Sequence, residues 1–156
     1  MANWIRIETR QPTAGPFDLP WLPLVDMVEN FNWLRITAQG MWTPFPGVAL
    51  TCRPDGYGGF QLANSALVLA NCPMGALIGK FGGSSAHAEP AKVADGQAAD
   101  DEAVATSSVF AIGSHCVLKL PTKPHGPLFI GFNLHSRPIE INNLTITVEG
   151  TTLGTT

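Results

Sequence analysis

The chain has 156 residues and a net charge of −3, and only 13% of its residues are charged. Its 16 glycines and 13 prolines favour short strands joined by turns over long helices. The nine basic residues are scattered, without the clusters that are typical of a nucleic-acid-binding protein. Length and composition therefore predict one all-β domain that binds no nucleic acid.

The N-terminus lacks a charged segment followed by an apolar core, so it does not resemble a secretory signal peptide. We therefore expect a cytoplasmic protein, or one exported without such a signal. The most apolar run, 62–79, is interrupted by Asn64, Asn71 and Pro73, which argues against a membrane span. The three cysteines include no Cys-x-x-Cys pair, and we interpret them as small buried side chains.

The first half of the chain predicts strands separated by loops. Trp4–Glu8 alternates polar and apolar residues as a strand does. Gln11–Pro23 contains four prolines and is expected to form a loop or a sheet edge. Leu24–Val28 and Asn32–Trp42 are expected to pair as a hairpin, the second strand having one buried and one wet face. Arg53–Tyr57, Arg-Pro-Asp-Gly-Tyr, predicts a turn.

The second half of the chain predicts six further strands. Two are apolar at nearly every position, as expected for strands covered on both faces, and Gly75 and Gly79 in one of them indicate close packing. An acidic stretch at about 84–106 predicts a solvated insertion within a single domain spanning 1–150, and 151–156 predicts a frayed tail. The expected strands are Ala66–Ala70, Gly75–Phe81, Val109–Ile112, His115–Leu120, Pro127–Asn133 and Asn142–Glu149.

No local motif predicts catalysis. The chain has no Gly-x-Ser-x-Gly segment, and its four histidines lack the spacing of a metal site. Gly75–Lys80 places three residues between its glycines where a phosphate-binding loop has four, and Phe81 follows where that loop has Ser or Thr. We therefore expect a protein that is not an enzyme.

A series of segments resembles a known family when taken in order. They are Leu34–Trp42, Arg53–Tyr57, Gly75–Gly82, Phe110–Gly113, Gly126–Asn133 and Asn142–Val148. Together they resemble the bacterial PA-I-type galactophilic lectins over about 25–149. The resemblance implies a galactose-binding-domain-like antiparallel β-sandwich of the jelly-roll type. It also implies a homo-oligomer that binds galactosides through a calcium ion.

The resemblance further implies that two loops supply the calcium ligands. The implied ligands are the Phe45 carbonyl and the side chains of Asn133, Asn142 and Asn143. However, Leu134 stands where the family has an aspartate, and Arg137 adds a positive charge nearby. Because calcium is held by oxygen ligands, carboxylates above all, we expect weak or absent calcium dependence.

Two functional hypotheses follow, from different classes. The first is a lectin-like module for galactosides or related glycans. Its sugar-contacting residues would be Trp42, Asp55, Tyr57 and His135. The second is a structural assembly module that has kept the sandwich but lost sugar binding, and that associates through the apolar Phe17–Leu24 segment. A third hypothesis, a hydrolase, is supported only by the general observation that one fold can host many different functions.

Overall fold

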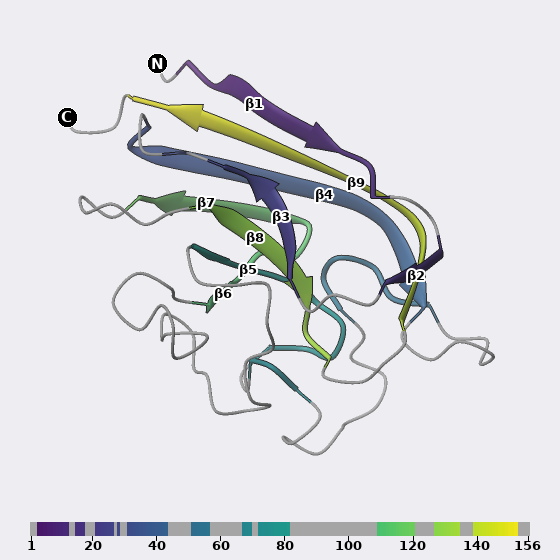
Figure 1. Cartoon of the computed structure of the whole chain (residues 1–156). Helices are drawn as coiled ribbons and strands as arrows, with labels where there is room; N and C mark the ends of the chain where they lie inside the picture. The colour runs from purple at the N-terminus through teal and green to yellow at the C-terminus, as the bar shows by residue number, and fades with distance from the viewer. Residues whose placement is uncertain are drawn as a thin grey trace.

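The computed structural model describes residues 3–12, 15–17, 21–26, 28, 31–43, 51–56, 67–69, 72–81, 109–120, 127–134 and 139–152. These residues include no helix, and their strands form two antiparallel sheets that make a β-sandwich (Figure 1). The all-β prediction is confirmed. The expected insertion at about 84–106 lies outside the described residues.

The first sheet, sheet A, contains the two longest strands of the described chain. Its strands are β1 (Ile5–Arg10), β2 (Gly15–Phe17), β4 (Trp33–Thr43), β7 (His115–Lys119) and β9 (Ile139–Thr151). Their order is β1–β9–β4–β7, and β2 also pairs with β9. Figure 1 shows β4 and β9 running side by side through the upper layer, with β1 beyond β9.

The second sheet, sheet B, is shorter and more deeply buried. Its strands are β3 (Leu22–Val25), β5 (Leu77–Phe81), β6 (Val109–Ala111) and β8 (Leu128–Phe132), in the order β3–β8–β5–β6. Every residue of β5 and β8 is buried, which confirms that the apolar run in 75–81 is a strand covered on both faces.

The core between the sheets follows the period of two in the sequence. Leu34 and Ile36 of β4 are fully buried, and Leu144, Ile146 and Val148 of the neighbouring β9 lie on the same inner face at 4% exposure or less. Because neighbours in a strand point to opposite faces, the intervening side chains form the outer face of sheet A. The alternation therefore confirms the predicted buried and wet faces of β4.

One predicted strand pairing and one predicted strand differ from the structure. Leu24–Val28 and Asn32–Trp42 do not form a hairpin, because β3 pairs with β8 in sheet B while β4 pairs with β7 and β9 in sheet A. Periodicity specifies a strand but not its partner, and both Leu24 and Val28 are buried between the sheets. The described part of the predicted strand Ala66–Ala70, residues 67–69, belongs to no strand.

A small second core covers the outer face of sheet B. It contains Trp21, Val68, Leu69, Ile78, Val109 and Phe129. Lys80 of β5 is fully buried here, with its Nζ 5.0 Å from the Trp21 ring centroid and 5.2 Å from that of Phe129. Since Trp21 and Leu24 are at most 2% exposed, these members of the Phe17–Leu24 segment pack within their own chain.

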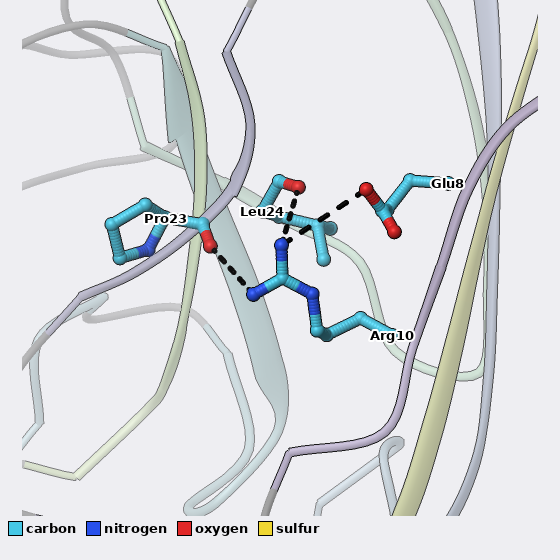
Figure 2. Close-up of polar contacts among 4 residues, drawn as sticks. All are labelled: Glu8, Arg10, Pro23 and Leu24. Carbon is cyan, nitrogen blue, oxygen red and sulfur yellow. Dashed lines mark hydrogen bonds and ion pairs between the residues drawn. The ribbon is translucent and has the colours of Figure 1, made fainter.

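Arg10 joins the edges of the two sheets (Figure 2). From β1 in sheet A, its guanidinium donates to the carbonyl oxygens of Pro23 at 3.4 Å and Leu24 at 3.3 Å in sheet B. Glu8 lies 4.0 Å away on the same strand and keeps a carboxylate beside the guanidinium. The side chain thereby satisfies backbone carbonyls at the edge strand β3.

The last strand, β9, extends one residue into the segment that was predicted to be a frayed tail. Thr151 belongs to β9 and is 2% exposed, and its carbonyl accepts a hydrogen bond from the Asn32 backbone amide at 2.9 Å. The strand therefore continues past the predicted boundary at 150.

Among the described residues there is no helix with the length and apolarity needed to cross a membrane.

Candidate functional site

An extra residue in β9 shapes one end of sheet A. Met41 of β4 pairs with Asn143, and Trp42 pairs with Ile141, so Asn142 is bulged out of the ladder. A bulge shifts the alternation by one residue. As a result Asn142 and Asn143 are both exposed, although they are neighbours in a strand.

The bulge is held by a side-chain hydrogen bond across the strands. The Thr43 hydroxyl donates to Asn142 Oδ1 at 2.8 Å. Two of the predicted ligand residues, Asn142 and Asn143, are therefore together on the surface, at the end of β4 and β9.

Asn133 is placed in a different environment. It is fully buried, and its Oδ1 accepts the Leu69 amide hydrogen at 2.6 Å. Its Nδ2 donates to the carbonyls of Leu69 at 3.0 Å, Cys72 at 2.9 Å and Pro73 at 3.1 Å. All polar atoms of this side chain are thus used to fix the segment that leads into β5.

Trp42 is also an interior residue. It is 1% exposed, its ring centroid lies 4.5 Å from that of Phe132, and its Nε1 donates to the Gly75 carbonyl at 3.0 Å. Its backbone exchanges two hydrogen bonds with Cys52, at 2.7 and 2.9 Å. In this arrangement the indole offers no face on which a sugar ring could stack.

Asp55 lies at the predicted turn and supports a second turn. Residues 53–56 form the turn, closed by a 2.8 Å bond from the Gly56 amide to the Arg53 carbonyl. The Asp55 carboxylate accepts from the Ser114 amide at 2.7 Å and from the Ser114 hydroxyl at 3.0 Å. It therefore anchors the connection at which the chain passes from β6 in sheet B to β7 in sheet A.

The described residues of the predicted calcium site lie in different environments. The amide oxygen of Asn133 is enclosed and already bonded, whereas that of Asn142 lies at the exposed bulge. Among the described residues no group of three or more His, Cys, Asp or Glu side chains is placed to hold a metal ion. Phe45, Tyr57 and His135 of the predicted site lie outside the described residues.

The outer face of sheet A provides a site that the sequence prediction did not select. Residues directly opposite each other in neighbouring strands share a face. Thr37 pairs with Thr147, and Gln39 pairs with Thr145, which places their side chains side by side on this face. A depression of about 190 Å³ lies among them; we call it the threonine pocket. Its lining residues are Thr37, Ala38, Gln39, Thr145 and Thr147.

Further polar groups extend the pocket across the sheet. Thr9 of β1 pairs with Thr147, and His115 of β7 pairs with Thr37, so one row of the sheet reads Thr, Thr, Thr, His. The Gln11 amide donates to the Thr145 hydroxyl at 3.3 Å in the next row. The sequence signal for this face is the alternation of polar residues in β4 and β9, whereas the predicted calcium ligands were assigned to loops.

A charged row borders the threonine pocket on its other side. Arg35 pairs with Glu149, and its Nε donates to Glu149 Oε1 at 2.9 Å. The guanidinium carbon of Arg35 lies 4.6 Å from the centroid of the Trp4 ring. Along both strands this row is two residues from the Thr37–Thr147 pair, which is about 7 Å.

The chain matches no protein-family model, no curated protein and no solved structure.

Proposed function

We propose that this protein is a non-catalytic, lectin-like carbohydrate-binding module that holds galactosides or related glycans on the outer face of sheet A, without a need for calcium. The observation that carries the proposal is the threonine pocket. Three threonine hydroxyls and one glutamine amide line it, and none of its side chains is charged. Hydroxyls and amides both donate and accept hydrogen bonds, which matches the hydroxyl groups of a sugar.

The size and support of the threonine pocket favour a small polar ligand. Its volume of about 190 Å³ is below the roughly 300–1,000 Å³ of sites that enclose drug-sized molecules, so it suits one ring of a longer glycan. Its residues belong to β4 and β9, which pair along eleven positions. Groups on such strands are held in position before the ligand arrives, which lowers the entropic cost of binding.

The placement of the asparagines supports calcium-independent binding. The Asn133 side chain is hydrogen-bonded to the backbone of Leu69, Cys72 and Pro73, so the family mechanism would lack one of its side-chain ligands. Asn142 and Asn143 are retained in the proposal as exposed amides at the end of the same face. The jelly-roll connectivity and the homo-oligomer implied by the resemblance are likewise retained as proposals.

The test is glycan binding with and without a chelator, using matched valine variants. Thr37→Val and Thr147→Val remove hydroxyls but keep the shape and strand preference of threonine. Each is expected to weaken binding by about 1 kcal/mol, or roughly fivefold, the usual worth of one hydrogen bond. Thr51→Val is the control, because Thr51 is exposed and belongs to no strand.

Chelation of calcium is expected to leave binding unchanged. A folded protein that binds no glycan at all would favour the assembly module instead. That alternative predicts self-association, to which Ile5 at 57% exposure and Val117 at 46% would contribute as exposed apolar side chains. Sedimentation of the same sample separates the two outcomes.

A further inference from the structure

Arg35 is held as an oriented cation beside the threonine pocket. Glu149 accepts a hydrogen bond from its Nε, and its guanidinium carbon lies over the Trp4 ring, 4.6 Å from the centroid. The Arg35 side chain keeps 31% of its surface exposed, so it is fixed without being enclosed. A guanidinium that is already oriented loses little conformational entropy when it binds an anion.

The two terminal nitrogens of Arg35 carry the remaining donors. Arginine has five N–H groups in a planar fork, and only the one on Nε is bonded to Glu149. Among the described residues, the hydrogen bond of the Arg35 guanidinium starts from Nε, not from Nη1 or Nη2. This pair of nitrogens has the geometry that binds both oxygens of a carboxylate.

The surroundings of Arg35 favour an anion, although the whole chain has a net charge of −3. On the outer face of sheet A, Arg6 lies opposite Glu149, and Lys119 lies opposite Trp33, two residues from Arg35 on the same face. Near Arg35, among the described residues, Arg6, Lys119 and Arg35 itself thus accompany the carboxylate of Glu149; the other carboxylate on this face, Glu140, lies at the far end of β9. Charge complementarity of this kind selects ligands and speeds their encounter.

We propose that the preferred ligand is a carboxylate-bearing sugar, a uronic acid or a sialic acid. Its carboxylate is bound by Nη1 and Nη2 of Arg35, and its ring hydroxyls are bound by Thr37 and Thr147 in the threonine pocket. The two rows are only about 7 Å apart along the strands, so one sugar residue can contact both. Glu149 disfavours a dianionic phosphate more than a singly charged carboxylate, because repulsion grows with charge. This inference rests on the proposed carbohydrate-binding function.

The experiment compares acidic and neutral ligands by isothermal titration. The probes are sialyllactose, a galacturonic acid trimer, the methyl ester of that trimer, and lactose. Wild-type protein is expected to bind one or both acidic probes at least about tenfold more tightly than its neutral counterpart, the usual gain from hydrogen bonds to a charged group. The two acidic probes distinguish the sialic acid from the uronic acid source.

Two variants give opposite expectations. Arg35→Gln is expected to remove the preference for the acidic probe and to leave lactose binding as it was. Glu149→Gln is expected to strengthen binding of the acidic probe, because it removes a repelling charge while keeping an oxygen for Nε. Loss of folding would weaken binding in both variants, so the rise with Glu149→Gln separates a charge effect from a structural one.

The outcomes separate this inference from the proposal beneath it. Equal affinity for acidic and neutral probes in the wild type would overturn the acidic-sugar inference and leave carbohydrate binding intact. No heat with any of the four probes from a folded sample would overturn both. If Arg35→Gln left the affinity for the acidic probes unchanged, the carboxylate would be bound by another residue, and the assignment to Arg35 would be overturned.

Discussion

The side chain of Asn133 pairs with the backbone of Leu69 as a neighbouring strand would. Its Oδ1 accepts from the Leu69 amide at 2.6 Å, and its Nδ2 donates to the Leu69 carbonyl at 3.0 Å. The backbone of Asn133 meanwhile exchanges bonds with Gly75 and Ala76, at 3.0 and 2.9 Å. One residue at the end of β8 thus supplies hydrogen bonds to the backbone of the segment that leads into β5.

Asn133→Ala is therefore expected to destabilise the fold. Removing the amide leaves the buried backbone amide and carbonyl of Leu69 without these hydrogen bonds, each at a cost of about 1–3 kcal/mol, and also removes the bonds to the part-buried carbonyls of Cys72 and Pro73. Urea denaturation should show a clearly lower midpoint. Asn143→Ala is the control, since Asn143 is exposed, and it should stay within about 0.5 kcal/mol of wild type. Similar midpoints for the two variants would refute the structural role of Asn133.

Residues of β6 and its end pack closely against Gly79 of β5. A Cβ at Gly79 would lie 2.8 Å from both Ile112 Cδ1 and Phe110 Cζ, closer than atoms approach without movement. Phe110 is itself stacked on Phe81, with ring centroids 5.4 Å apart, so it has little room to shift. Gly79→Val should cost about 1–3 kcal/mol through overpacking. Gly79→Ala should fall between wild type and Val, and a valine variant as stable as the alanine variant would contradict the argument.

Cys52 is expected to resist thiol reagents in the native state. Burial raises the pKa of its thiol from the ordinary 9.0 to about 11, because the interior disfavours the thiolate. Only the thiolate reacts, so in a Cys72→Ser/Cys116→Ser variant the remaining thiol should be silent at pH 8 and react rapidly in urea. Rapid labelling without denaturant would show that the site opens locally.

The same pKa shift makes the stability depend on pH. Well below pH 9.0 the Cys52 thiol is protonated in both the folded and the unfolded chain, so its ionisation does not change the free energy of unfolding. As pH rises from 9.0 towards about 11, the unfolded chain ionises while the folded chain holds its proton, and stability falls. Cys52→Ala should flatten this part of the curve of unfolding free energy against pH.

Much of the sandwich was predictable because burial imposes a pattern on the sequence. The alternation in β4 and the apolar run in β5 each follow from which faces of a strand are covered. Strand partners were harder to predict. β3 shows why: a strand has the same alternation of buried and exposed residues whichever sheet it belongs to. The bulge at Asn142 also escaped prediction, since an extra residue is visible only once the partner strand is known.

The site was harder to predict than the fold, for a chemical reason. Asparagine, aspartate and tryptophan bind ligands with the same atoms that satisfy backbone groups. Asn133, Asp55 and Trp42 all use those atoms within the chain. The residues of the threonine pocket gave no motif, because Thr37 and Thr147 are 110 positions apart and meet only through the pairing of β4 with β9.

Asp55 allows the structural and the ligand-binding roles to be tested in one residue. Its carboxylate accepts two hydrogen bonds from Ser114, and Gly113 permits this approach, since a Cβ there would lie 2.7 Å from Asp55 Oδ1. Asp55→Ala should therefore lower stability by about 1–2 kcal/mol, as expected for losing charge-assisted bonds at a turn.

Asp55→Asn separates the two roles, because its amide oxygen still accepts from the Ser114 backbone while the negative charge is lost. We expect this variant to recover part of the lost stability and both variants to bind glycans as wild type does, since Asp55 is absent from the lining of the threonine pocket. The measurements are a denaturation midpoint and a titration at a temperature where every variant is folded. A large loss of glycan affinity in stably folded Asp55→Asn would return Asp55 to the binding site and place that site at the 53–56 turn instead of on sheet A.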